Sequence, residues 1–241
     1  MNTPTIFLIS FLSTLYSFTL SQTPEVGLIL PPEEFGSNYQ CCIAIPLTGF
    51  TLYKEAKSNS IAGCILPTSE KNTRERYNFQ TQPTSDGKMI DLKDFHRMSY
   101  EISCLKYLEI SQGFVKINES YWIKKEELET MGFQLSSWMD FLVKNSGNFL
   151  GYYANDPGLN LRRGIGTEYE KILTMKGDEM EISLTGEVKG LWAKVKLKQY
   201  KEHPCNQMEA GEPQILNTYE GWAKILDDSG TPNIHYYAGG C

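Results

Sequence analysis

The stretch Gly158-Leu159-Asn160-Leu161-Arg162-Arg163-Gly164 decides how the chain is expected to fold. Leu159 and Leu161 alternate with polar residues, which is the period-two pattern of a half-buried strand. A second marker stretch, Glu220-Gly221-Trp222-Ala223-Lys224-Ile225, follows later in the chain. We expect the first stretch to open a small β-domain and the second to close it.

Three further strands are predicted between these markers, and an insertion at 198–218 precedes the closing strand. The five expected strands are 159–162, 169–175, 179–184, 191–197 and 219–225. A strand this short cannot bury a hydrophobic core by itself. Five such strands therefore imply a closed or nearly closed barrel.

These elements resemble the bacterial Src-homology-3-like (SH3-like) domains of exported and cell-envelope proteins. The family pattern is an opening L-N-(V/L)-R strand, a Gly-containing loop, a strand ending at a K-G turn, a W-x-K-V strand and a closing G-W-(V/A). The matching segments are Leu159–Arg162, Gly164–Thr167, Ile172–Gly177, Trp192–Val195 and Gly221–Ala223. The resemblance covers about residues 153–226 and implies a barrel with a shallow aromatic groove for extended peptides. The insertion and the tail from Pro232 to Cys241 depart from the pattern and could reshape that groove.

The first half resembles a second, diverged copy of the same domain. The parallels are Gly49–Tyr53 with Gly158–Arg162, Gly113–Ile117 with Leu191–Val195, and Tyr121–Ile123 with Gly221–Ala223. Residues 67–99 would be its inserted loop. The polar part of that loop, 67–88, is either functional or a tolerated insertion, since both kinds are exposed.

The expected fold class is mostly β, with two small SH3-like β-barrels joined by a short amphipathic helix. In chain order we expect a signal peptide at 1–21, an extended lead-in at 22–38, the diverged barrel at 39–130, the linker helix at 131–150 and the second SH3-like domain at 151–241. The helix is predicted from apolar residues at Leu135, Trp138, Met139 and Leu142, which share one face. Such a short stripe indicates a structural strap, with a partner-binding helix as the alternative.

The first segment of the chain predicts export. Residues 6–20 are uncharged and mostly apolar, and the run is too short to span a bilayer well. Thr19-Leu20-Ser21 offers a small-x-small cleavage site; an uncleaved anchor is the alternative. The mature protein would then lie in the periplasm, outside the cell or on its surface, with no membrane span left.

An oxidising compartment permits disulfides, and the chain has 6 cysteines. Cys205 with Cys241 is the simplest pairing and would stabilise the second domain by about 4 kcal/mol. The remaining candidates are Cys41, Cys42, Cys64 and Cys104, of which one of the adjacent pair is expected to bond to Cys64 or Cys104. No C-x-x-C spacing is present, so we expect no metal site.

Composition and motifs argue against several function classes. The net charge is −6 without a basic cluster, which argues against a nucleic-acid partner. The three histidines, His96, His203 and His235, lack the paired spacing of metal ligands. No D-C-x-G-like segment and no base–nucleophile pair stands out, so we expect neither an enzyme nor a cofactor.

Aromatic residues of the second half are the best candidates for binding. The candidate ligand-binding residues are Tyr153, Trp192, Trp222, Tyr236, Tyr237 and Arg162. Aromatic residues beside barrel loops can line a groove for peptides. The alternatives are that Trp192 and Trp222 belong to the core and that Arg162 forms a local salt bridge. The two tail tyrosines are expected to be exposed.

The sequence therefore predicts an exported, non-catalytic binding module that recognises a peptide, a cell-wall fragment or an envelope protein. One alternative is a structural or accessory subunit of an envelope assembly without a small ligand. Another is an accessory of a cell-wall hydrolase.

Overall fold

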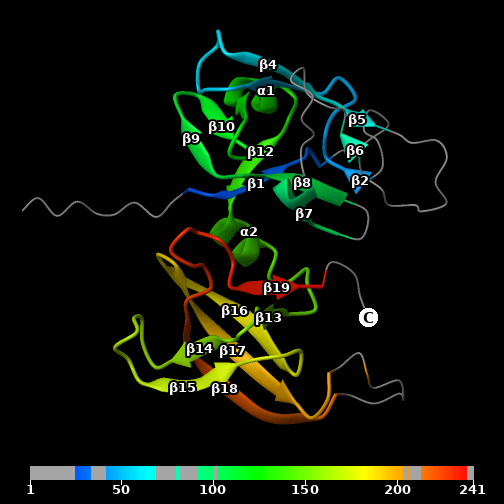
Figure 1. Cartoon of the computed structure of the whole chain (residues 1–241). Helices are drawn as coiled ribbons and strands as arrows, with labels where there is room; N and C mark the ends of the chain where they lie inside the picture. Colours follow the sequence, from blue (N-terminus) through cyan, green and yellow to red (C-terminus); the bar gives the residue numbers. More distant parts are fainter. Residues whose placement is uncertain are drawn as a thin grey trace, which may run out of the picture.

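The protein is mostly β and consists of two halves stacked on each other, with a short helix between them (Figure 1). The computed structural model describes residues 25–33, 42–68, 80–81, 92–99, 102–203, 206 and 213–237. Within these residues the α-helices are α1 at Lys125–Thr130 and α2 at Trp138–Lys144. The prediction of a mostly β chain is confirmed.

One seven-stranded antiparallel sheet forms the C-terminal half, in the order β15-β14-β18-β17-β16-β13-β19. Its strands are β13 (Tyr152–Ala154), β14 (Leu159–Arg162), β15 (Lys171–Met175), β16 (Met180–Lys189), β17 (Trp192–Tyr200), β18 (Ile215–Ala223) and β19 (Ile234–Tyr236). In β14, Leu159 and Leu161 are buried, whereas Asn160 and Arg162 are only partly buried. The alternation predicted for the opening strand is confirmed.

This sheet does not close into a barrel among the described residues. The opening strand β14 pairs with both β15 and the closing strand β18, and β18 continues through β17 to β16. The ring is interrupted between β15 and β16. The free side of β16 pairs instead with β13, which pairs with β19. Instead of the expected closed or nearly closed barrel, the described strands form an open sheet. This sheet is extended beyond β16 by β13 and β19.

Five strands of the N-terminal half repeat this order. The opening strand β3 (Phe50–Tyr53) lies between β4 (Ile61–Ile65) and β11 (Trp122–Lys124), and β11 continues through β10 (Phe114–Lys116) to β9 (Glu109–Ser111). The order β4-β3-β11-β10-β9 matches β15-β14-β18-β17-β16 strand for strand.

Residue pairing agrees between the two sheets as well. The matching pairs are Tyr53–Trp122 with Arg162–Trp222, Lys116–Trp122 with Lys194–Trp222, and Val115–Ile123 with Ala193–Ala223. Each opening hairpin also has one register shift, between Leu52 and Tyr53 in the first and between Leu161 and Arg162 in the second. These positions are the ones that the sequence parallels aligned.

A glycine precedes each opening strand in the same environment. Gly49 and Gly158 both have positive φ, at 73° and 120°. A Cβ on Gly49 would collide with the carbonyl oxygen of Ile65, and a Cβ on Gly158 would lie 2.8 Å from that of Met175. Only glycine accepts both this backbone conformation and this close approach without strain.

The remaining strands of the N-terminal half include a segment that was expected to be a lead-in. A second sheet has the order β12-β1-β8-β2, with β7 also on β8. Its strands are β1 (Gly27–Leu30), β2 (Cys42–Ile43), β7 (Phe95–Arg97), β8 (Ile102–Tyr107) and β12 (Gln134–Ser137); a small ribbon pairs β5 (Pro67–Thr68) with β6 (Gln80–Thr81). In β1, Leu28 and Ile29 are fully buried. The lead-in prediction was wrong for β1, because adjacent apolar residues are buried on both faces of a central strand.

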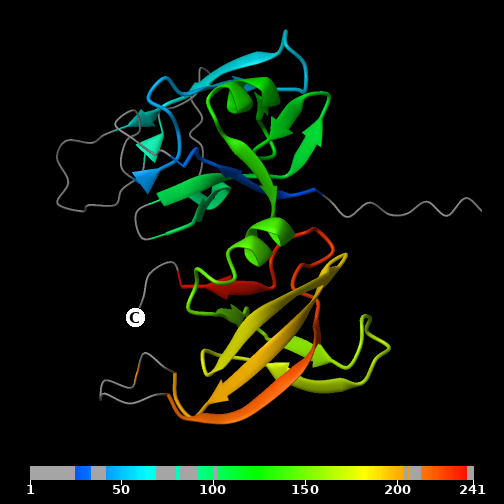
Figure 2. The same ribbon diagram turned by 180° about the vertical axis from the view of Figure 1, so that it is seen from behind.

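The linker helix is shorter than predicted. It begins at Trp138, where the Ser137 side chain accepts a hydrogen bond from the Asp140 backbone N–H at 3.1 Å. Leu135 lies instead on β12, paired with Ile29 of β1. The apolar spacing correctly predicted the buried face of α2. It wrongly placed Leu135 in the helix, because this residue belongs to β12. In both views α2 lies between the two halves, beside β19 (Figure 2).

The two halves share one core through a group of rings that we call the aromatic seam. Its members are His96, Trp138, Phe141, Phe149, Tyr152 and Tyr236. Tyr236 stacks on Phe149 with centroids 3.8 Å apart, and its hydroxyl lies 2.7 Å from His96 Nε2 across the halves. The halves therefore pack against each other as one body.

Several sequence predictions lie outside the described residues: the signal peptide at 1–21, Cys41, Cys205, Cys241 and most of the polar loop. Cys64 and Cys104 are free thiols, exposed on β4 and buried on β8 respectively, and burial raises the pKa of the Cys104 thiol. Cys42 lies on β2 beside Ile102. In the described parts of the chain, no helix has the length and apolar character needed to cross a bilayer.

Candidate functional site

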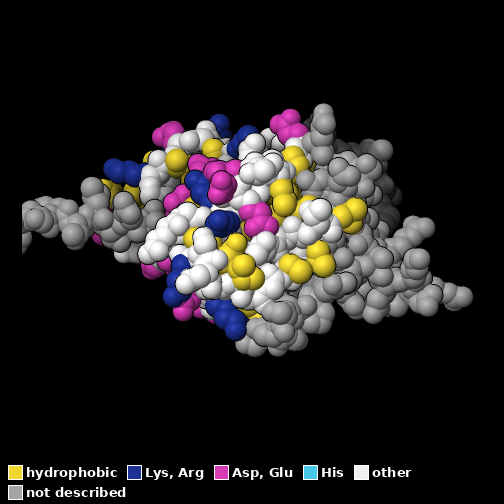
Figure 3. Space-filling model, turned by 90° about the horizontal axis from the view of Figure 1, so that it is seen from above, with side chains coloured by type: hydrophobic (Ala, Val, Ile, Leu, Met, Phe, Trp, Pro, Cys, Tyr) yellow, Lys and Arg dark blue, Asp and Glu magenta, His cyan; other side chains and the backbone are white. Residues whose placement is uncertain are grey.

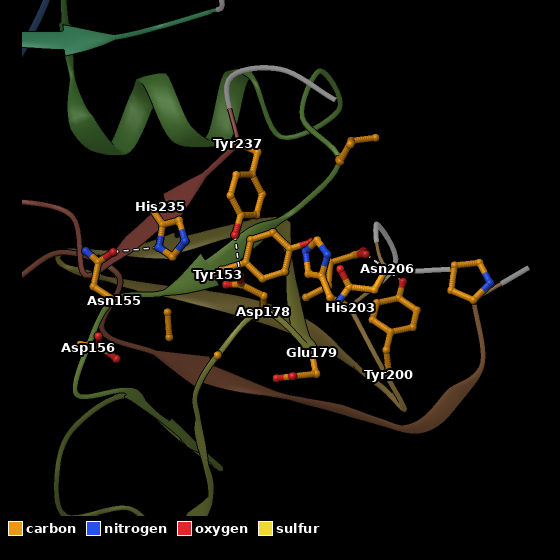
Figure 4. A pocket seen from close by; sticks show the side chains of 15 residues that line it. Tyr153, Asn155, Asp156, Asp178, Glu179, Tyr200, His203, Asn206, His235 and Tyr237 are labelled. Atoms are coloured by element: carbon orange, nitrogen blue, oxygen red, sulfur yellow. Dashed lines mark hydrogen bonds between the residues drawn. The ribbon is translucent and has the colours of Figure 1, made fainter. Parts of the chain in front are cut away.

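A pocket of about 1080 Å³ opens at the β19 end of the C-terminal sheet (Figure 4). It lies between β13, the turn that joins β15 to β16, the end of β17, and β19. Its described lining comprises Leu150, Tyr153, Ala154, Asn155, Asp156, Gly177, Asp178, Glu179, Glu181, Tyr200, His203, Asn206, Pro213, His235 and Tyr237. We call it the tyrosine pocket.

Four rings form one wall of the tyrosine pocket. Tyr153 lies 5.4 Å from Tyr237, 5.7 Å from His203 and 5.9 Å from His235, measured between ring centroids. Tyr153 and His235 are paired residues on neighbouring strands. Tyr237 follows His235 by two positions and so lies on the same face. Strand pairing and strand alternation together bring the rings into one cluster.

Carboxylates line the pocket beside these rings. Asp178 and Glu179 lie on the β15–β16 turn, where Gly177 has a φ of 69°, and Asp156 follows β13. The Tyr237 hydroxyl donates to Asp178 Oδ2 at 2.6 Å (Figure 4). Asp156 and Glu179 form no ion pair with another described residue. Among the described lining residues there is no Lys or Arg.

Glu181 differs from these carboxylates because its charge is already compensated. It is buried, accepts a hydrogen bond from the Tyr200 hydroxyl at 2.8 Å and lies 3.4 Å from Lys198 Nζ. These contacts stabilise the floor of the pocket and leave Glu181 with little capacity to bind a ligand.

Tyrosine acidities reflect the negative potential of the pocket. The hydrogen bond to Asp178 is the main cause that raises the pKa of Tyr237 to about 12. Burial raises the pKa of Tyr153, and the charges of Glu181 and Asp178 add to this effect. Both phenols therefore stay protonated and neutral at physiological pH.

Hydrogen bonds fix the orientation of His235. Asn155 Nδ2 donates to the Pro232 carbonyl at 3.0 Å, which leaves Asn155 Oδ1 as an acceptor. His235 Nδ1 lies 2.9 Å from that oxygen and must be the donor.

Only part of the predicted binding set meets at this pocket. Tyr153 and Tyr237 line it, and Tyr237 is 40% exposed. Tyr236 points the other way into the aromatic seam, so its predicted exposure was wrong. Alternation along β19 separates the neighbouring tyrosines.

The other predicted residues lie elsewhere on the sheet. Arg162 donates to the carbonyl oxygens of Thr167 and Tyr169 at 2.9 and 2.8 Å, and so holds its own loop. Trp222 pairs with Arg162 between β18 and β14. Trp192 begins β17. Trp192 and Trp222 are both half-buried, and neither lines the tyrosine pocket.

Sequence reasoning missed the carboxylates and histidines of the pocket. Asp178 and Glu179 directly follow the K-G turn that was used to identify the domain. The two acidic residues at this turn could have indicated an acidic site. His203 and His235 were considered as metal ligands and as partners of a catalytic cysteine, but not as part of a binding site. Among the described residues there is no group of His, Cys, Asp and Glu suited to a metal ion.

A second pocket of about 1040 Å³ lies between the two halves. It is lined by residues of both, including His96, Trp138 and Tyr236 of the aromatic seam. Its charged lining is mixed, with Lys93, Lys106, Asp94 and Glu119. The Asn118 amide donates to the buried Asp94 at 3.0 Å. Mixed charge gives this pocket less preference for one class of ligand than the tyrosine pocket has.

Comparisons of the chain with protein-family models, with curated proteins and with solved structures give no match.

Proposed function

We propose that the chain is an exported, non-catalytic binding module of two SH3-like domains, which recognises an extended peptide at the tyrosine pocket. The peptide could be free, part of a cell-wall fragment or a segment of an envelope protein. The site of action is the periplasm, the cell surface or the outside of the cell, as the apolar stretch at 6–20 predicts.

The two-domain part of this proposal is supported by the repeated sheet. Strand order, residue register and the position of the register shift agree between β3–β11 and β14–β18. In both sheets the first strand pairs with the last, which is the contact that a barrel needs to close. Apart from the loop Gly164–Thr167, the segments that resemble the SH3-like pattern overlap strands of the second sheet, which supports the proposal.

The binding part rests on one observation, the aromatic wall of the tyrosine pocket. Rigid rings provide contact area at low cost in side-chain entropy and are enriched where peptides and proteins bind. Leu150, which is 61% exposed, lines the same pocket and offers an apolar contact next to the rings. The face of the N-terminal half that Figure 3 shows, by contrast, mixes basic, acidic and apolar side chains.

Calorimetric titration with short peptides and soluble cell-wall fragments tests the proposal. The exported protein should bind at least one of them, and Tyr237→Ala should weaken the binding about tenfold. Tyr169→Ala is the matched control, because Tyr169 is also an exposed tyrosine of this half but does not line the pocket. The proposal is wrong if the protein retains neither ligand class and only a protein partner copurifies with it.

A further inference from the structure

Resting on the proposed function, we infer that the tyrosine pocket takes the cationic amino group of its peptide ligand. The group is an alkylammonium, carried either by a lysine-type side chain or by a free peptide N-terminus. This defines which peptides bind, beyond the proposal that a peptide binds.

Ring geometry is the first argument. Tyr153 and Tyr237 have centroids 5.4 Å apart with an angle of 58° between their planes, and His203 and Tyr237 lie at 79°. His235 and Tyr237 are nearly perpendicular, at 88°. Rings at such angles do not stack into one flat surface, so this wall presents both ring faces and ring edges to the pocket. An ammonium group within about 6 Å of aromatic faces is attracted by their quadrupoles.

Charge is the second argument. Asp156, Asp178 and Glu179 all line the space beside the rings, and the described lining has no Lys or Arg to neutralise them. Among the described residues, Asp178 accepts a side-chain hydrogen bond only from the neutral hydroxyl of Tyr237. An anionic ligand would be repelled here, and a neutral ligand would leave the charges uncompensated. A cation is stabilised by both the rings and the carboxylates.

Comparison with other carboxylates of the same half strengthens this point. Four of them have a basic partner: Glu170 with Arg163, Glu187 and Glu220 with Lys194, and Asp228 with Lys224. Glu181, at the floor of the pocket, forms an ion pair with Lys198. Asp156, Asp178 and Glu179 have no such partner among the described residues, and they differ from the unpaired Glu168 and Asp227 in lining the pocket, where a ligand can balance their charge.

The hydrogen bond from Tyr237 to Asp178 is the third argument. It holds the phenol ring against the carboxylate, so the ring face and the negative charge are positioned together before a ligand arrives. The same hydrogen bond raises the pKa of Tyr237 to about 12. Preorganisation of this kind reduces the ordering cost of binding.

Four capped or uncapped tripeptides test the inference by titration of the full exported chain. Acetyl-Gly-Lys-Gly-amide carries a side-chain amine, and Gly-Gly-Gly-amide carries only an α-amine. Acetyl-Gly-norleucine-Gly-amide has a neutral side chain of similar length, and acetyl-Gly-Glu-Gly-amide has an anionic one. At least one amine peptide should bind about tenfold or more tightly than the norleucine peptide, and the Glu peptide should bind most weakly. The two amine peptides then show which source of the amine the pocket prefers.

Charge-neutral variants locate the effect. Asp178→Asn with Glu179→Gln should reduce the affinity for the amine peptide about tenfold, with little change for the norleucine peptide. Glu168→Gln is the control, because Glu168 is exposed like Glu179 but lies outside the pocket. Circular dichroism of each variant shows that the fold is retained.

The outcomes separate this inference from the proposed function. If the norleucine and amine peptides bind equally, and both are weakened by Tyr237→Ala, the pocket binds peptides but the cationic preference is wrong. If no peptide and no cell-wall fragment binds, the proposed function itself fails. A tight amine complex that is unchanged in the double variant also overturns the inference, since the cation would then lie elsewhere.

Discussion

At the scale of single residues, the contact between Tyr237 and Asp178 does most to define the pocket. A hydroxyl that donates to a carboxylate loses its proton less readily, and this raises the pKa of Tyr237 to about 12. The bond also fixes a ring that would otherwise be free to rotate at the surface.

Asp178→Asn should therefore lower the pKa of Tyr237 towards the ordinary value of about 10. The amide accepts a weaker hydrogen bond and carries no charge to oppose the phenolate. Ultraviolet absorbance of the phenolate, followed between pH 8 and 13 against a Tyr237→Phe reference, measures this. Asp156→Asn is the control and should leave the titration nearly unchanged. An unaltered titration in Asp178→Asn would show that the hydrogen bond does not form in solution.

His96 is the second residue whose environment makes a measurable prediction. Burial, helped by the charge of Lys106, lowers the pKa of His96 from 6.5 to about 4. The unfolded chain takes up a proton as the pH falls below 6.5, whereas the folded chain does not. The contribution to stability is thus complete above pH 6.5 and is lost as the pH falls to 4, by about 3 kcal/mol at most.

His96→Gln should remove this part of the pH dependence while keeping a side chain that can bond to the Tyr236 hydroxyl. Urea unfolding of both proteins at pH 7, 5.5 and 4.5 gives the comparison, and the stability difference should shrink or reverse as the pH falls. Equal slopes for wild type and His96→Gln would contradict the buried, neutral imidazole.

At the scale of elements, the two opening hairpins share the same strand pairing and the same position of a glycine before the first strand. A methyl group on Gly49 or Gly158 would meet a backbone carbonyl, and both glycines have positive φ. Alanine at either position should therefore destabilise the protein by about 1–3 kcal/mol. Gly147→Ala should change stability by less than about 0.5 kcal/mol, because its Cβ would enter open space. Chemical unfolding measures all three, and a neutral Gly158→Ala would contradict the shared hairpin geometry.

The elements show why sequence reasoning succeeded in one place and failed in another. Leu159 and Leu161 alternate on one strand, and the sequence alone is enough to predict that pattern. Leu28, Ile29 and Leu30 do not alternate, and two prolines follow them, so β1 looked like an extended leader. Closure of the sheet depends on whether β16 pairs with β15 or with β13. Which partner β16 takes depends on contacts between segments that are far apart in the sequence. Local sequence patterns therefore cannot predict it.

The candidate site, like the fold, was predicted only in part from the sequence. Its tyrosines were found because aromatic residues were counted, but a three-residue strand gave too little pattern to tell Tyr236 from Tyr237. The carboxylates lie on a turn whose K-G sequence was used only to identify the domain. Their convergence with His235 requires the pairing of β13 with β19, which the sequence did not predict.

At the scale of the whole molecule, the aromatic seam joins the halves. Trp138 is 6% exposed and contacts both His96 and Phe141, on the N-terminal sheet and α2 respectively. Tyr236 continues the contact into β19, whose other face holds His235 in the tyrosine pocket. The tyrosine pocket and the junction between the halves thus share one strand.

The halves should therefore unfold in one cooperative transition, and Trp138→Ala should lower the stability by about 3–5 kcal/mol. Differential scanning calorimetry of the wild type should show a single peak, with equal calorimetric and van't Hoff enthalpies. Two separate peaks in the wild-type protein would contradict the shared core. A Trp192→Ala control removes a tryptophan outside the seam and should leave the transition single.

The central claim is that the tyrosine pocket holds the amino group of a peptide. Backbone amide resonances of the labelled protein, followed by NMR during titration with acetyl-Gly-Lys-Gly-amide, test it most directly. The largest shifts should arise from Tyr153, Asp178, Glu179, His235 and Tyr237, and the norleucine peptide should cause much smaller ones. Shifts centred on Trp192 and Trp222, or the absence of shifts with either peptide, would contradict the account.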